Sequence, residues 1–333
     1  MSTPLAPLTT LDVGGSASTF IEVTTELELI EAAIGHPHAV LLGSGSNVVI
    51  SDEGLDAVIA VRTRGVDVQR SDEQATLRIA AGEVWDDVVL LADDHQFAGI
   101  EAMAGIPGLV GAAPMQNIGA YGQELSATCT RVKVLDRRSG EVLELDASEC
   151  GFGYRSSRFK SESGRYVILD VTLTLGTGGH SVVQYFELAK RLGVPVGASA
   201  PTRAIASAVR ELRAEKGMLL DPEDRDTYST GSYFTNPIVT EDSRFPPSCP
   251  HFAADGGVKL SAAWLIEHAG IEKGWGLNDR ARVSTKHTLA LTNRGGASAN
   301  DIIELGDVIA AKVFEQFGVA LEREPVLLGR FSE

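Results

Sequence analysis

Apolar residues three to four positions apart recur in several stretches of the chain, and this is the spacing of one buried face of an α-helix. Leu27, Ile30 and Ala33 form the first such face, and Thr25 with Glu28 has the spacing of a capping box at its start. Three later stretches show the same spacing after a Pro or Ser and before a Gly, which are typical start and stop signals. The pattern predicts four helices, which begin after Thr25, Pro201, Ser261 and Ser298 and end near Gly35, Gly217, Gly270 and Gly318.

Short β-branched and apolar runs, separated by turn residues, predict strands in the rest of the chain. Residues 39–42 form one such run, which leads into a Gly-rich turn, and 48–50 resume strand character at once. Similar runs alternate with turn residues over 76–91 and 131–175. This texture is typical of an α+β fold with a mixed or antiparallel sheet, and the helices of the last third indicate a separate C-terminal domain.

The turn at 43–47 reads Gly-Ser-Gly-Ser-Asn and follows a buried strand, which is a usual position for a phosphate-binding turn. A Rossmann site needs a helix directly after the glycines, whereas a strand follows here. A P-loop is excluded because the chain has no Gly-Lys-Ser/Thr run. Two interpretations remain: a backbone nest whose N–H groups and serine hydroxyls face an anion, or a plain hairpin turn.

A second Gly-rich stretch covers residues 99–122 and contains six glycines, two prolines and almost no charge. Such a composition cannot form a regular helix or a central strand. A long loop inside a compact domain is usually functional, and the few polar side chains are Gln116, Asn117 and Tyr121. The backbone is therefore expected to contact a flat, amide-rich ligand, and the alternative is a packed structural loop.

Composition and net charge limit the kinds of molecule that the protein can bind. The 333 residues are enough for two or three domains, and 44% hydrophobic with 22% charged residues is typical of an ordinary globular protein. The net charge of −16 argues against nucleic acid or an anionic membrane, because both need a basic face on the protein. A small anion could still bind in a locally positive pocket.

The cysteines and histidines give no sign of a disulfide framework or a metal site. Cys129, Cys150 and Cys249 are far apart and odd in number, which favours reduced thiols, and no histidine pair has metal-ligand spacing. Residues 1–10 lack a cationic stretch followed by an apolar core, so no signal peptide is expected. No apolar run reaches 18 residues, and we expect a cytoplasmic protein without a membrane span.

Six segments of the chain carry a family resemblance: 41–47, 105–122, 153–160, 231–237, 263–266 and 322–325. Together they resemble the family of UDP-N-acetylenolpyruvoylglucosamine reductases, the flavoenzymes that complete UDP-N-acetylmuramic acid. The resemblance covers nearly the whole chain and implies a fold in which two subdomains hold FAD in the vanillyl-alcohol-oxidase manner and a third α/β domain binds the UDP-sugar. It implies FAD-binding subdomains at 1–69 with 318–333 and at 70–216, and a substrate domain at 217–317.

The resemblance also implies binding residues. Substrate groups match Tyr185, Lys216, Asn236 and Lys273, and the two lysines would supply positive potential for the UDP phosphates. The FAD contacts implied by the two Gly-rich loops are Gly43, Ser44, Gly45, Ser46, Asn47, Ile106, Pro107, Gly108, Gly111, Asn117, Gly119, Ala120 and Tyr121.

Arg155, Ser232 and Glu324 match the catalytic trio of that family. The resemblance implies that NADPH reduces the flavin first and leaves, after which flavin N5 delivers hydride to the methylene carbon of the enolpyruvyl sugar. Arg155 would stabilise the enolate charge, and Ser232 would donate the proton to the neighbouring carbon. Glu322 competes with Glu324 for the acid role, and Glu324 aligns with the second acid of the family's Glu-Pro-Glu form.

Two positions depart from the family pattern. Thr235 stands where a basic residue is frequent, and the chain has His287-Thr288-Leu289 where relatives commonly have His-Ala-Asn, which leaves the role of the third position open. The alternatives are an FAD-dependent oxidase of a hydroxy acid or alcohol, which would not need the third domain, and a non-catalytic nucleotide-binding protein without flavin colour. No stripe of interface residues stands out, so a monomer is expected.

Overall fold

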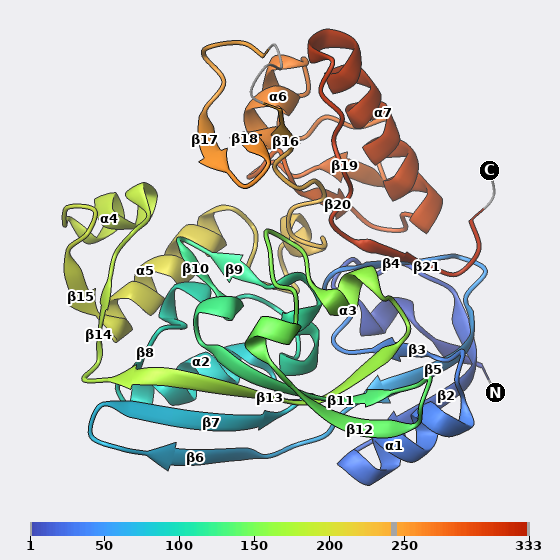
Figure 1. Cartoon of the computed structure of the whole chain (residues 1–333). Helices are drawn as coiled ribbons and strands as arrows, with labels where there is room; N and C mark the ends of the chain where they lie inside the picture. Colours follow the sequence, from blue (N-terminus) through green and yellow to red (C-terminus); the bar gives the residue numbers. More distant parts are fainter. Residues whose placement is uncertain (1, 241–244, 332–333) are drawn as a thin grey trace. The chain divides into compact units, whose positions relative to one another are not determined.

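The computed structural model describes residues 2–240 and 245–331, which form two compact units (Figure 1). Unit 1 consists of Met1–Ser18, Gly45–Leu55 and Glu215–Glu333, and unit 2 consists of Thr19–Ser44 and Asp56–Ala214. Each unit has a hydrophobic core of its own. The three-part division into FAD subdomains and a substrate domain stays a prediction.

Unit 2 is organised around an antiparallel sheet with the strand order β12-β11-β13-β7-β6, and β8 pairs with the end of β13. Leu77 lies opposite Leu173 and Val132 lies opposite Val171, so the inward faces of the three central strands stack buried aliphatic side chains. The strands are β6 (Val66–Arg70), β7 (Gln74–Ala80), β8 (Phe97–Ala98), β11 (Cys129–Asp136), β12 (Glu141–Asp146) and β13 (Tyr166–Thr177).

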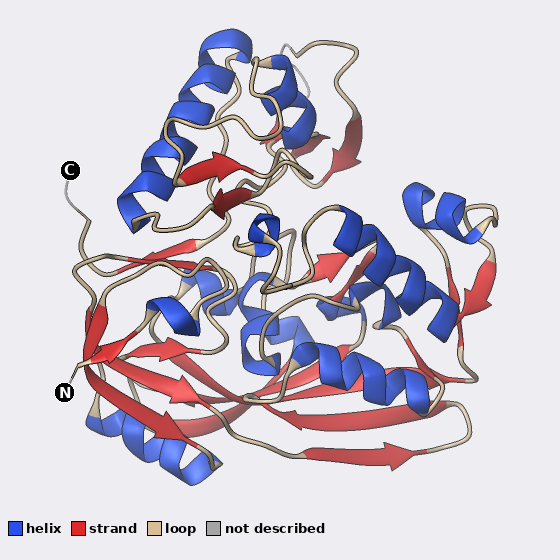
Figure 2. Ribbon diagram, turned by 180° about the vertical axis from the view of Figure 1, so that it is seen from behind, coloured by secondary structure: helices blue, strands red, loops and turns tan. Residues whose placement is uncertain are grey.

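Helices cover both faces of this sheet. Figures 1 and 2 show α2 and α5 on one side of the long strands and α1 on the other. Trp85 and Phe97 are almost fully buried and fill the core beneath α2. The helices are α1 (Glu26–Gly35), α2 (Trp85–Asp94), α3 (Arg158–Ser161), α4 (Phe186–Leu192) and α5 (Thr202–Glu215).

Smaller strand pairs complete unit 2. β3 (Val40–Leu42) runs parallel to β5 (Leu55–Val61), with Val40 opposite Val58. The Gly-rich stretch contributes the pair β9 (Gly119–Ala120) and β10 (Gln123–Glu124), and β14 (His180–Val182) pairs with β15 (Ser199–Pro201).

Unit 1 packs two helices against short sheets. Its core contains Tyr233, Leu265, Ile302 and Ile309, all without exposed surface. No helix in the described part of the chain is long and apolar enough to span a membrane. The main elements are β4 (Val48–Ile50), β16 (Ile238–Val239), β17 (His251–Ala254), β18 (Gly257–Leu260), α6 (Ala262–His268), β19 (Ala281–Val283), β20 (Leu291–Asn293), α7 (Ala299–Phe317) and β21 (Val326–Leu328).

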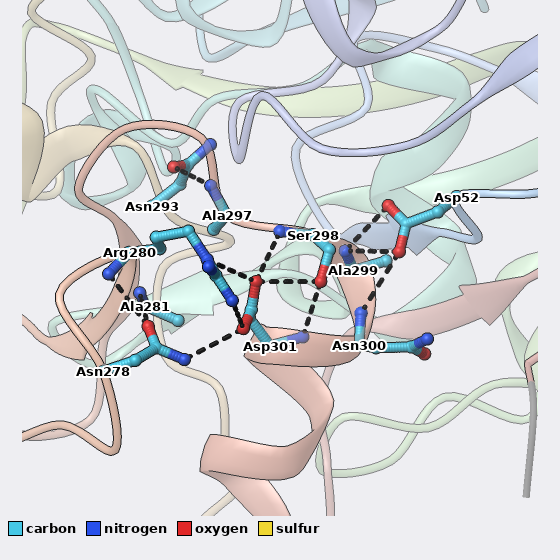
Figure 3. Close-up of polar contacts among 10 residues, drawn as sticks. All are labelled: Asp52, Asn278, Arg280, Ala281, Asn293, Ala297, Ser298, Ala299, Asn300 and Asp301. Atoms are coloured by element: carbon cyan, nitrogen blue, oxygen red, sulfur yellow. Dashed lines mark hydrogen bonds and ion pairs between the residues drawn. The ribbon is translucent and has the colours of Figure 1, made fainter.

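The first turn of α7 is fixed by a dense polar network (Figure 3). Ser298 and Asp301 form a reciprocal capping box, and the Asp301 carboxylate also accepts two hydrogen bonds from Arg280 at 3.1 and 2.8 Å. Asp52 accepts from the free backbone amide of Ala299 at 2.9 Å. Hydrogen bonds from Arg280 hold the pKa of Asp301 well below its usual range. The start of this helix is therefore anchored from two other segments of unit 1.

The four helices predicted from capping signals and apolar spacing are confirmed as α1, α5, α6 and α7. The strand texture predicted over 76–91 is wrong after residue 84, because Trp85, Val88 and Val89 share the buried face of helix α2. The preference of valine for strands reflects how its side chain packs in a sheet, and it depends on the surroundings. In α2 the packing of the valines into the core outweighs that preference.

Candidate functional site

The turn at 43–47 is not a hairpin. β3 pairs with β5 and β4 pairs with β21, so the turn joins strands that do not pair with one another. The Ser44 hydroxyl is buried and has no hydrogen-bond partner among the residues described. An unsatisfied buried hydroxyl is costly, and a phosphate oxygen would satisfy it. Of the two interpretations of this turn, the anion-binding one fits the structure.

The stretch from 103 to 111 is held along its backbone by the start of α2. Trp85 binds it twice: its backbone N–H donates to the carbonyl of Gly108 at 3.0 Å, and its indole N–H donates to the carbonyl of Met103 at 3.2 Å. Gly108 has a φ of 139°, a conformation that residues with a side chain rarely adopt. The loop is thus a fixed backbone surface, as a ligand platform requires.

Charged side chains form hydrogen bonds with both the N–H and the carbonyl of Gly105. Its N–H donates to Asp86 at 2.6 Å, and its carbonyl accepts from Arg213 at 3.1 Å. Arg210 binds the same Asp86 carboxylate through two hydrogen bonds at 2.6 and 2.7 Å. Burial lowers the pKa of the Arg213 guanidinium to about 10, so it remains a cation at neutral pH. We call Asp86, Arg210 and Arg213 the Gly105 clamp.

Sequence reasoning missed the Gly105 clamp. The one available signal was the three-residue spacing of Arg210 and Arg213 on a predicted helix, which places both guanidinium groups on one face. Asp86 could not be found, because the stretch around it was predicted as strand and turn.

Arg155, the predicted catalytic cation, lies beside the second half of the Gly-rich stretch within unit 2. Its guanidinium donates to the carbonyl of Gly119 at 3.1 Å, and its own carbonyl accepts from Lys160 at 3.0 Å. Arg155 also has a φ of 49°, which is unfavourable for a residue with a side chain. Strained backbone of this kind clusters at functional sites.

Asn117, a predicted FAD contact, uses its side chain to hold the loop itself. It is 1% exposed, donates to Glu124 and to the carbonyl of Gly153 at 3.0 and 3.1 Å, and accepts from the Ser126 amide at 2.9 Å. These contacts use both amide hydrogens and the oxygen. The contact of Asn117 with FAD stays a prediction.

Tyr185, the predicted substrate-capping residue, packs edge-on against the predicted FAD contact Tyr121, with ring centroids 5.5 Å apart. Tyr185 stands just before α4 and remains 46% exposed, so its outer face is accessible to a ligand. Burial of the phenol and the nearby Glu187 raise the pKa of Tyr185, which keeps the hydroxyl neutral.

In unit 1 the C-terminal tail pairs with the segment that follows Ser232. The Glu324 amide donates to the carbonyl of Tyr233 at 2.9 Å, and the Thr235 amide donates to the carbonyl of Glu322 at 3.0 Å. Glu324 is half-buried in this pairing, whereas Glu322 is exposed. The structure thus brings Glu324 to the residue next to Ser232, which favours Glu324 over Glu322 as the acid.

The remaining predicted residues of unit 1 have different environments. Asn47 donates to the carbonyl of Glu324 at 3.4 Å, and Asn236 accepts from the Ala262 amide at the start of α6. Lys216 is half-buried after α5, and Lys273 is exposed after α6. Gly45 and Ser46 belong to the turn before β4. Residues 2–240 and 245–331 contain no group of acidic, His and Cys side chains able to hold a metal ion.

Four further residues of unit 2 are predicted to contact FAD: Ile106, Pro107, Gly111 and Ala120. They lie on the same Gly-rich stretch, and the Gly111 amide donates to the carbonyl of Ala81 at 2.8 Å. A side chain on Gly111 would meet the Ala81 methyl group at 2.7 Å. The Gly-rich stretch therefore approaches Ala81 too closely for any residue other than glycine at position 111.

Comparison with known proteins gives two family matches. Residues 221–328 match the family described as "UDP-N-acetylenolpyruvoylglucosamine reductase, C-terminal domain", and residues 22–146 match the family described as "FAD binding domain". The α+β fold with an FAD-binding part, implied by the resemblance, is confirmed. That this part is of the vanillyl-alcohol-oxidase type stays a prediction.

Several relatives match along almost their entire length. The UDP-N-acetylenolpyruvoylglucosamine reductases of Streptomyces coelicolor and Cutibacterium acnes are 48% and 47% identical, each over 98% of this chain and 89% of the relative. The crystal structure of UDP-N-acetylenolpyruvylglucosamine reductase from Thermus caldophilus superimposes with a TM-score of 0.67 at 26% identity. That alignment covers 99% of this chain and 98% of the other.

Proposed function

The chain belongs to the family of UDP-N-acetylenolpyruvoylglucosamine reductases, and on that premise we propose that it reduces UDP-N-acetylenolpyruvoylglucosamine to UDP-N-acetylmuramate with NADPH as the electron donor. It is an FAD-dependent oxidoreductase. Each turnover consumes one NADPH and one proton for each sugar reduced. The observation that carries the proposal is the backbone pairing that brings Glu324 to the residue next to Ser232.

FAD fits the two Gly-rich loops. The buried Ser44 hydroxyl lacks a partner within the described chain and can donate to a phosphate oxygen, and the rigid backbone after Gly105 offers a flat surface to a ring system. When bound, FAD would supply the hydride-transfer chemistry that links NADPH to the methylene carbon of the enolpyruvyl group.

Arg155 would bind and stabilise the substrate carboxyl group. Its planar guanidinium can hold a carboxylate in a two-pronged geometry, and hydride addition spreads negative charge onto the carbon conjugated to that carboxylate. A cation already in place stabilises this charge without reorganisation. The hydrogen bond to the carbonyl of Gly119 keeps the side chain oriented before the substrate arrives.

Ser232 would donate the proton to that same carbon. A serine hydroxyl is a weak acid in water, so it must be held in position and polarised to be effective. Glu324 would polarise the reacting group from the neighbouring tail, as a hydrogen-bonded partner of the substrate carboxyl. Lys216, Asn236 and Lys273 would hold the UDP part, and Tyr185 would cover the substrate.

We also propose the three-part division at 1–69 with 318–333, 70–216 and 217–317, a monomeric state, and a cytoplasmic location. The location follows from the chemistry, because UDP-sugars and NADPH are cytoplasmic metabolites. In this setting the reaction would be a step in the synthesis of peptidoglycan precursors.

Steady-state turnover tests the proposal. The purified protein should contain FAD and should oxidise NADPH only when UDP-N-acetylenolpyruvoylglucosamine is present, with UDP-N-acetylmuramate as the product. Oxygen uptake with a hydroxy acid or alcohol, without turnover of the sugar, would identify an oxidase instead. A protein that binds nucleotides but carries no flavin would exclude both enzymes.

A further inference from the structure

Helix α7 carries a glycine, Gly306, in its interior. Glycine destabilises the interior of a helix relative to alanine, so its presence there calls for a local reason. An added Cβ at this position would lie 2.4 Å from Cε1 of the Tyr233 ring and 2.9 Å from its Cζ. The helix therefore has a hollow at Gly306 that the Tyr233 ring fills.

The Tyr233 ring has no room to move away from α7. The residue has no exposed surface, and Phe234 packs edge-on against it with ring centroids 5.1 Å apart. The backbone of Tyr233 is held as well, because its amide donates to Leu289 at 2.7 Å and its carbonyl accepts from Glu324 at 2.9 Å. A methyl group on Gly306 would thus have to displace both Tyr233 and its neighbours.

The next residue of α7 contacts the tail. The carboxylate of Asp307 lies 3.7 Å from the guanidinium of Arg323, and Arg323 is paired with Phe234 as an isolated β-bridge. Consecutive positions of one helix therefore contact the two segments that carry Ser232 and Glu324. The helix itself is anchored at its first turn by Asp301 and its partners (Figure 3).

From this geometry we propose that Gly306 is a positioning residue for the proton-transfer step. The absence of a side chain allows Tyr233 to seat against α7, and this contact fixes Ser232 on one side and, through the backbone of Tyr233, Glu324 on the other. The inference rests on the proposed function of Ser232. A substitution at Gly306 should therefore slow the reduction of the sugar and leave the reduction of the flavin unchanged.

The test compares the two half-reactions of the FAD-loaded Gly306→Ala variant under anaerobic conditions. We expect NADPH to bleach the flavin at a rate within about twofold of wild type, and UDP-N-acetylenolpyruvoylglucosamine to restore its colour at least about tenfold more slowly. A displacement of ~1 Å at a reacting group can cost about a hundredfold in rate. Gly35→Ala is the matched control, because a Cβ there has no neighbour within 4 Å, and both of its rates should stay at wild type.

Two further variants separate positioning from a general loss of structure. Tyr233→Leu in the Gly306→Ala background removes the clashing ring edge, and we expect it to recover part of the lost rate. If Gly306→Ala does not fold, Tyr233→Leu alone serves, because it removes the same contact and should slow the same half-reaction selectively.

Equal slowing of both half-reactions, or a normal rate of sugar-driven reoxidation, would overturn the inference. The Ser232→Ala variant separates the positioning role of Gly306 from the proposed function of Ser232. If Ser232→Ala is slow and Gly306→Ala is normal, only the positioning role of Gly306 fails. If Ser232→Ala itself reoxidises normally, the proposed function of Ser232 fails first.

Discussion

The Gly105 loop in unit 2 and the Ser232 segment in unit 1 are both held rigidly, but by different physical means. Gly105 is fixed by hydrogen bonds to the charged side chains of Asp86 and Arg213. Tyr233, next to Ser232, is fixed by its ring against Gly306 and by its backbone. The first arrangement depends on charge, and the second depends on shape.

This difference matches what each region is proposed to do. A loop that presents its backbone to a cofactor must keep its peptide groups oriented, and charge-assisted hydrogen bonds are strong and directional. A proton donor must keep its distance to the reacting carbon, and close packing resists displacement because interiors have few voids. Changes of charge should therefore affect FAD binding, and changes of volume should affect proton transfer.

The largest effect is expected at Ser232. Ser232→Ala removes the proposed proton donor and should slow sugar-driven reoxidation of the flavin by about 10²- to 10⁴-fold, the usual contribution of general acid catalysis. Bleaching by NADPH should remain unchanged. Rapid-mixing absorbance of the two half-reactions measures both rates, and a normal reoxidation rate would contradict the role of Ser232.

A smaller effect is expected at the Gly105 clamp. Asp86→Asn removes the carboxylate that holds Gly105 and pairs with Arg210. Loss of a charged hydrogen bond costs about 1–3 kcal/mol, which corresponds to roughly 5- to 150-fold weaker binding of FAD. Quenching of FAD fluorescence measures the dissociation constant. Asp87→Asn is the matched control, because this neighbouring carboxylate is exposed. Equal affinity in the two variants would show that the clamp does not act on the cofactor.

The smallest effect is expected at the anchor of α7. Asp301→Asn should lower the free energy of unfolding by about 1–2 kcal/mol at neutral pH, because it weakens both the capping box and the pair with Arg280. The pKa of Asp301 is depressed in the folded state, so its contribution is fully present above the unfolded value of about 3.9 and is lost as the pH falls through the folded value.

Thermal unfolding of both proteins at a series of pH values checks this prediction. The difference in Tm between wild type and Asp301→Asn should be largest at neutral pH and should shrink under acid conditions. A difference that grows as the pH falls would contradict the assigned sign.

Much of the fold could be predicted from signals within short stretches of sequence, namely helix caps and the spacing of apolar residues. The helices α5, α6 and α7 could be predicted because their caps and apolar faces lie within one short stretch of sequence. Helix α2 could not, because its valine-rich sequence favours a strand until its buried face is known. The two Gly-rich stretches could be singled out because their glycines lie close together in the sequence, and their contacts with FAD stay a prediction.

The supporting contacts could not be predicted in the same way. Asp86 and Arg210 are distant in sequence, and no local pattern pairs them. Gly306 looks like an unfavourable helix residue until the Tyr233 ring is placed against it. The choice of Glu324 over Glu322 rested on a family resemblance, and the pairing with Tyr233 now gives it a geometric basis.

A single-turnover experiment decides whether this chain transfers hydride and a proton to an enolpyruvyl sugar. The FAD-loaded protein is bleached anaerobically with one equivalent of NADPH and then mixed with UDP-N-acetylenolpyruvoylglucosamine. We expect the visible flavin band to return as UDP-N-acetylmuramate forms in equal amount. A flavin that stays bleached in the presence of the sugar would contradict it.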